Sequence, residues 1–153
     1  MRRRLRKIIH CFAPNDSYVI GSIANIEWEK YVRLSRGLDD PTSLDSNLDH
    51  VIEYSQKAIE INRLDRGAYQ WLWLAQLQRN EKLDALKAMM ANYQMDPSDI
   101  YLSFTIGRYL ASLDKPSLSR PFLDRVKNFS HHNQERQTAR AILDAIPAGK
   151  VND

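Results

Sequence analysis

The amino-acid sequence predicts an all-α fold of about seven helices that pair as antiparallel hairpins. Apolar residues recur at steps of three and four along most of the chain, as they do on the buried face of a helix. Asp, Asn, Gly and Pro residues that begin or end helices interrupt this pattern repeatedly. No segment alternates apolar and polar residues convincingly, so strands are not expected.

The first two helices are expected over residues 17 to 36 and from Leu48 to Ile61. Asn15-Asp16-Ser17 supplies N-cap residues for the first helix, and Gly37 supplies its stop. A turn-like connector around Pro41 is expected from Asp39 to Asn47. The apolar face of the first helix consists of Ile20, Ile23, Ala24, Trp28 and Tyr31.

Five more helices are expected over residues 66 to 79, 81 to 95, 99 to 113, 119 to 129 and 133 to 146. Asp65 is placed to cap the first of these, which is apolar nearly all round and needs cover on several sides. Pro121 requires a helix that begins near Ser119, because a proline costs little only in the first turn. Residues 17 to 147 are therefore expected to form one helical domain, between an arm (1 to 16) and a tail (148 to 153).

A period of about 34 residues relates these helices. If Pro97 closes one repeat, a large aromatic residue (Tyr69), a leucine (Leu72), a small residue (Ala85) and a bulky one (Met89) occupy fixed positions. In the next repeat Ile106-Gly107 and Leu123 take such positions, and the segment Ala58-Ile59-Glu60-Ile61-Asn62 ends a partial one. Small residues let helix backbones approach closely, and large ones fill the gaps between them.

This pattern resembles the tetratricopeptide repeat, with a partial repeat at 48–65, repeats at 66–99 and 100–133, and a capping helix at 133–146. Three positions depart from the family's pattern: Trp73 stands where it favours Gly, and Asn92 and Ser119 stand where it favours Ala. An unrelated helical bundle is the alternative.

The resemblance implies a protein-interaction module that binds a peptide or helix in a concave groove. Leu74 stands where the family's two-carboxylate clamp needs an Asn, so that subtype is not expected. The helix of residues 17 to 36 or that of residues 133 to 146 is the alternative occupant of the groove. The implied groove residues are Gln70, Leu74, Leu77, Gln78, Tyr101, Phe104, Arg108, Ala111 and Ser112.

Basic charge is concentrated at the start of the chain. The arm holds a net charge of +4, against +3 for the whole chain, so the remainder is nearly neutral. A solvated tail is the commonest meaning of such a run. The alternative is an adaptor that binds an anionic membrane, where each cation contributes about 1 kcal/mol to the binding free energy. Binding to nucleic acid is less favoured, because no aromatic residues that could stack on bases accompany the cations. The basic residues are Arg2, Arg3, Arg4, Arg6 and Lys7.

Catalysis, cofactors and metals are not expected from the motifs. No GxGxxG, Walker or HExxH pattern occurs. His10-Cys11 lacks any accompanying oxyanion hole, and His131-His132 with Glu135 lacks the spacing of a closed metal site. The single cysteine suits a reducing compartment, and no run of about 20 apolar residues occurs that could span a membrane. We therefore expect a cytoplasmic protein that is either free or peripheral to a membrane. A soluble domain that follows a membrane span in a longer protein is the alternative. The oligomeric state is left open.

Removal of residues 2 to 7 tests the adaptor hypothesis. If the arm binds anionic surfaces, the intact chain floats with anionic liposomes, or binds DNA in a salt-dependent manner, and the truncated chain does not. Flotation and DNA binding at rising salt measure the two cases. Equal behaviour of the two chains would exclude the adaptor.

Overall fold

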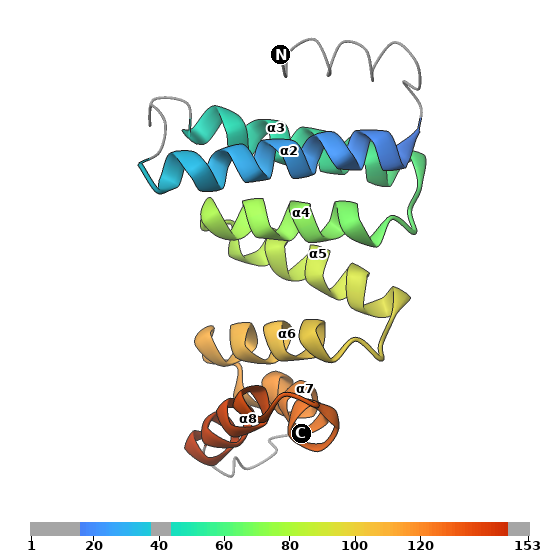
Figure 1. The fold of residues 1–153 in the computed structure, drawn as a ribbon. Helices are drawn as coiled ribbons and strands as arrows, with labels where there is room; N and C mark the ends of the chain where they lie inside the picture. The colour runs from blue at the N-terminus through green and yellow to red at the C-terminus, as the bar shows by residue number, and fades with distance from the viewer. Residues whose placement is uncertain (1–15, 38–43, 147–153) are drawn as a thin grey trace. The chain divides into compact units, whose positions relative to one another are not determined.

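The computed structural model describes residues 16–37 and 44–146, and these residues form helices without any strand (Figure 1). The predicted all-α class is thus confirmed. The described residues fall into two compact units, of which the first ends at Met95 and the second begins at Asp96. The helices are α2 (Ser17–Ser35), α3 (Leu44–Ile61), α4 (Arg66–Gln78), α5 (Lys82–Met95), α6 (Ile100–Ser112), α7 (Pro116–Phe129) and α8 (Asn133–Ala145).

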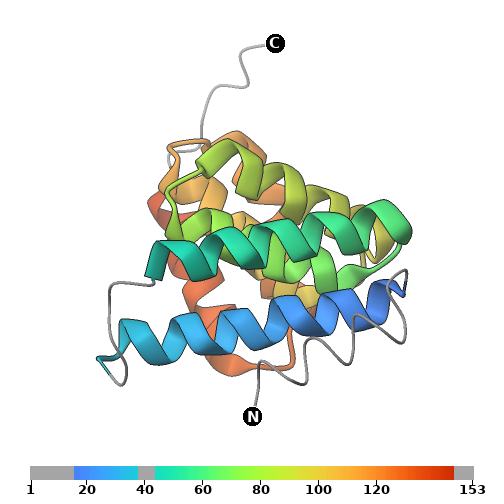
Figure 2. The same ribbon diagram turned by 90° about the horizontal axis from the view of Figure 1, so that it is seen from above.

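The first unit contains two antiparallel hairpins, α2 with α3 and α4 with α5 (Figure 2). Both α2 and α3 contact α4, so the second hairpin packs against the first. Ala58, Ala68 and Ala75 are fully buried at these contacts. Their small side chains let the helices approach closely, while Ile20 and Val51 fill the space beside them.

A carboxylate lies among the apolar residues of α2. Glu27 is fully buried, and its Oε2 lies 3.9 Å from Nδ1 of His50 on α3. The two groups form an ion pair when the imidazole carries a proton. The apolar stripe of α2 is therefore interrupted at its centre by a polar contact to α3.

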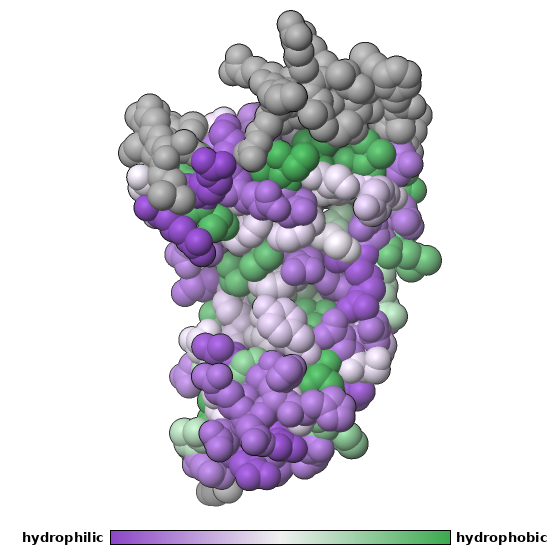
Figure 3. All heavy atoms as spheres, in the orientation of Figure 1, coloured by the Kyte–Doolittle hydropathy of each residue, from purple (hydrophilic) through white to green (hydrophobic). Residues whose placement is uncertain are grey.

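The second unit is one hairpin, α6 with α7, whose core α8 covers. Leu123 and Val126 of α7 are buried together with Ala139 and Leu143 of α8. The exposed side of α8 is polar, and Figure 3 shows hydrophilic residues gathered over it. α8 is therefore an amphipathic helix whose apolar side packs on the hairpin and whose polar side is exposed.

Helix bounds repeat at the interval that the sequence predicts. α4 (Arg66–Gln78) and α6 (Ile100–Ser112) each have 13 residues, and both ends of α6 lie one such period after those of α4. α5 (Lys82–Met95) and α7 (Pro116–Phe129) each have 14 residues and are separated by the same interval. The predicted period is therefore present in the backbone of both hairpins.

The turns that close the two hairpins share one geometry. Asn80 and Asp114 follow α4 and α6 with φ of 60° and 57°, in the left-handed region that Asn and Asp tolerate better than most residues. The amide of Glu81 donates to the carbonyl of Gln76 at 2.9 Å, and the amide of Lys115 donates to that of Leu110 at 3.0 Å. These bonds satisfy the last carbonyls of each helix in a Schellman arrangement.

The starts of α4 and α6 are also equivalent. The carboxylates of Asp65 and Asp99 accept hydrogen bonds from the amides of Ala68 and Leu102 at 3.0 and 2.9 Å. The predicted cap at Asp65 is thus confirmed. An N-cap of this kind stabilises a helix by about 1 kcal/mol, because it satisfies a backbone N–H that has no partner within the helix.

Ser119 and Asn92, which depart from the tetratricopeptide pattern, make hydrogen bonds between paired helices. Ser119 Oγ donates to the carbonyl of Gly107 at 2.8 Å and thereby links α7 to α6. Asn92 of α5 accepts from Nε of Arg66 at 3.1 Å and donates to the Arg66 carbonyl at 3.2 Å, which links α5 to α4. Each polar side chain replaces apolar contact between paired helices with a directed bond.

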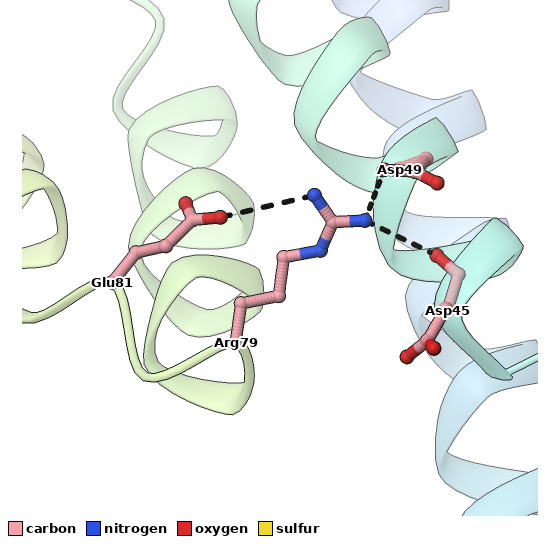
Figure 4. A network of polar contacts seen from close by, with 4 residues as sticks. All are labelled: Asp45, Asp49, Arg79 and Glu81. Carbon is pink, nitrogen blue, oxygen red and sulfur yellow. Dashed lines mark hydrogen bonds and ion pairs between the residues drawn. The ribbon is translucent and has the colours of Figure 1, made fainter.

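Arg79, just after α4, links the turn of the second hairpin to α3 (Figure 4). Its guanidinium forms an ion pair with Asp49, donates to the carbonyl of Asp45 at 3.5 Å and lies 3.8 Å from a carboxylate oxygen of Glu81. The Arg79 side chain is 27% exposed, whereas that of Asp49 is 60% exposed, so solvent partly screens this ion pair. The two hairpins of the first unit are therefore joined by charge as well as by packing.

Two predicted boundaries are wrong. α3 begins at Leu44 rather than Leu48, so the end of the predicted connector is helical; Asn47 is buried at 1% exposure, and Asp45 in the first turn favours the helix start. α7 begins at Pro116 rather than Ser119, because a proline at the first helical position is already fixed in a helical φ. Pro121 therefore lies inside α7, beyond the first turn.

Substitution of Gly107 with Ala tests the close approach of α6 and α7. An added Cβ would lie 2.7 Å from Cδ2 and 2.8 Å from Cγ of the buried Leu123. We expect a loss of about 1 to 2 kcal/mol, since overpacking costs about 1 to 3 kcal/mol and the better helix propensity of Ala recovers less than about 1 kcal/mol. Urea unfolding followed by far-UV circular dichroism measures the change.

Gly21→Ala in α2 is the matched control. Its Cβ would lie 3.4 Å from Oδ2 of Asp65, an acceptable contact. Stability should rise or stay the same, by up to about 1 kcal/mol. Equal losses in both variants would show that the α6–α7 contact is not the cause.

Candidate partner-binding surfaces

The predicted groove residues of the first unit lie along α4 with unequal exposure. Gln70 and Gln78 are exposed, and Leu74 and Leu77 are half-buried. Gln78 Oε1 accepts a hydrogen bond from the hydroxyl of Tyr31 at 3.1 Å, which ties it to α2. Gln78 is therefore held by a hydrogen bond to the first hairpin, whereas no hydrogen bond is described for the exposed Gln70.

The predicted groove residues of the second unit lie along α6. Tyr101 is 60% exposed, Arg108 and Ser112 are exposed, and Phe104 and Ala111 are half-buried. Ser112 Oγ donates to the carbonyl of Tyr109 in its own helix at 2.7 Å, so its hydroxyl is used locally. Burial raises the pKa of the neighbouring Tyr109 hydroxyl. Tyr101, Phe104 and Arg108 remain as the accessible binding groups of α6.

Phe104 and Arg108 border an open hollow between α6 and the start of α8, which we call the Arg108 hollow. Its volume is about 560 Å³. The guanidinium carbon of Arg108 lies 5.3 Å from the centre of the Phe104 ring, within the range of a cation–π contact. Arg108 has no ion pair among the described residues. The hollow is lined by Phe104, Arg108, His131, His132, Asn133, Gln134, Glu135 and Thr138.

The far wall of the Arg108 hollow is the first turn of α8. Its N-cap residue, His132, makes no side-chain capping bond. Ser130 Oγ instead accepts from the His132 amide at 3.1 Å and donates to Oε2 of Glu135 at 2.6 Å. The carboxylate of Glu135 is thus bound to the preceding turn, while Asn133 and Gln134 present their backbone at the positive end of the helix.

Sequence reasoning missed this wall. The sequence raises His131, His132 and Glu135 as metal ligands and disfavours that role because of their spacing. Within residues 16–37 and 44–146 no group of three His, Cys, Asp or Glu side chains is arranged to hold a metal ion. The sequence does predict that a helix starts at Asn133. It does not show that this start lies close to α6, because that distance depends on how the helices pack.

A second, smaller hollow of about 210 Å³ lies in the first unit between α2 and the start of α4. Tyr18 and Trp71 border it, and Gly21 and Gly67 leave it open because they have no side chain. Sequence reasoning missed the contribution of α2 here. The two glycines, one on each helix, were the available signal.

The predicted groove set is divided between the two compact units. Gln70, Leu74, Leu77 and Gln78 belong to the first unit, and the α6 residues belong to the second. Phe104 packs against the buried cluster of α7 and α8. The residues of the basic arm, like His10 and Cys11, lie outside the described part of the chain.

Comparison with known proteins finds no protein-family model and no curated relative that matches the chain. The seven described helices include none with the length and apolar character that crossing a bilayer requires.

Replacement of Phe104 separates its structural contribution from its place in the hollow. Phe104→Ala should lower the free energy of unfolding by about 1 to 3 kcal/mol, since the ring is half-buried against α8. Tyr101→Ala, at a 60% exposed position on the same helix, should change it by less than about 0.5 kcal/mol. Urea unfolding by circular dichroism compares them, and similar losses in both would mean that Phe104 is not part of the core.

Proposed function

We propose that the chain is a noncatalytic protein-interaction module of the tetratricopeptide kind, which binds a peptide or helix of a partner protein on the exposed face of α4 in the first unit or of α6 in the second. The single cysteine fits a reducing compartment such as the cytoplasm. The proposal rests chiefly on one observation. Two successive hairpins repeat their helix bounds, caps and turns at one fixed interval along the chain.

The exposure of the first helix in each hairpin supports this function. In an array of repeated hairpins, each helix has an inner face for its neighbours and an outer face that is open to partners. α4 and α6 both leave amphipathic residues accessible, including Gln70 on α4 and Tyr101 on α6. Tyr101 and Arg108 are both exposed on α6, and Tyr, Trp and Arg dominate the binding energy of many protein interfaces.

The adaptor alternative depends on Arg2, Arg3, Arg4, Arg6 and Lys7, which the structure does not describe. Nothing in the described residues favours it over the protein-binding proposal. It remains a prediction of the sequence, with its own test by truncation.

Site-specific photo-crosslinking tests the protein-binding proposal. p-Benzoylphenylalanine placed at Tyr101 or Gln70 should yield discrete protein adducts in cells of the source organism. The same group at Leu118, a 57% exposed position on α7, is the matched control and should yield none. Adducts of equal number from Leu118, or none from Tyr101 and Gln70, would count against binding on the first-helix faces.

A further inference from the structure

We infer that the partner segment carries an acidic side chain, and that the Arg108 hollow receives it with the Arg108 guanidinium as its ion-pair partner. This inference rests on the proposed function and names the chemistry of the ligand. It concerns the second unit alone, since every lining residue of the hollow belongs to α6, α8 or the turn before α8.

Arg108 has no charged neighbour on its own helix. It is the only charged residue of α6 (IYLSFTIGRYLAS), so no acidic side chain of its own helix can neutralise it. The contact that the described structure gives it is the face of the Phe104 ring, 5.3 Å away. Because Arg108 is exposed, its N–H groups are accessible to a planar carboxylate.

The wall opposite Arg108 is polar and includes the start of α8. His131 and His132 are exposed there, and they add positive charge when protonated. The acidic side chain of the lining is Glu135. Its carboxylate accepts a hydrogen bond from Ser130 Oγ at 2.6 Å, in the turn before α8, and is not paired with Arg108. The start of α8 also contributes a partial positive charge. An incoming carboxylate would therefore meet the Arg108 guanidinium on one side and the N–H donors at the start of α8 on the other.

The apolar neighbours of Arg108 define the rest of the ligand. Phe104 and the exposed Tyr101 lie one and two turns before Arg108 on the same helix. A side chain one turn away on a partner helix, or two residues away on an extended partner, would cover them while the carboxylate pairs with Arg108. The favoured partner is thus an amphipathic segment in which acidic and large apolar residues are close neighbours.

The experiment uses the full chain and two labelled peptides. One is a short peptide of alternating Leu and Glu, and the other has Gln in place of Glu. Fluorescence anisotropy should show at least tenfold tighter binding of the Glu peptide. Arg108→Gln should abolish that preference, whereas Arg140→Gln, which removes an exposed cation of α8 outside the hollow, should leave it unchanged.

The outcomes separate this inference from the proposed function. Equal binding of the two peptides, or equal losses in the two arginine variants, would overturn the inference, because charge would then act without a defined site. Arg108-dependent binding of a labelled DNA oligonucleotide in place of the Glu peptide would overturn it in favour of phosphate. If neither peptide binds but Tyr101 still gives protein adducts, only the acidic partner is wrong; if both assays fail, the interaction module is wrong as well.

Discussion

The left-handed residue that ends the first helix of each hairpin is the constraint on which the rest of the structure depends. At Asn80 and at Asp114 the chain reverses within a few residues, and the bonds from Glu81 and Lys115 satisfy the freed carbonyls. Because the reversal is the same in both places, the second helix returns along the first at the same offset. The buried positions of α5 and α7 then follow from the bounds of α4 and α6.

Close packing of helices and hydrogen bonds between them both stabilise the hairpins, in different proportions in the two units. In the second unit Gly107 lets Leu123 of α7 reach the backbone of α6, and Ser119 adds a directed bond to the same backbone. In the first unit the equivalent position holds Trp73, and Asn92 binds both the side chain and the carbonyl of Arg66. One backbone plan is thus stabilised in two chemically different ways, which is why the repeat is faint in sequence.

Local signals allowed most of the fold to be predicted. Apolar spacing, the cap at Asp65 and the breaks after α4, α5 and α6 depend on neighbouring residues, and the helix order follows from them. The misplaced starts at Leu44 and Pro116 depend on burial of Asn47 and on the tolerance of a proline inside α7, which only packing decides. The same holds for the candidate site: Phe104 and Arg108 were predicted from the resemblance, but the wall from His131 to Thr138 comes from another helix.

The ion pair between Arg79 and Asp49 has a consequence for the order of the hairpins. The residues one period later are Leu113 and Leu83, so the repeat does not carry this pair forward. Within the first unit, the hairpin of α4 and α5 brings a cation that α3 can neutralise with Asp49. A permuted order in which the hairpin of α6 and α7 followed α3 directly would place Leu113 where Arg79 stands and remove the cation that pairs with Asp49. Charge therefore favours one order of two hairpins that share the same helix lengths and turns.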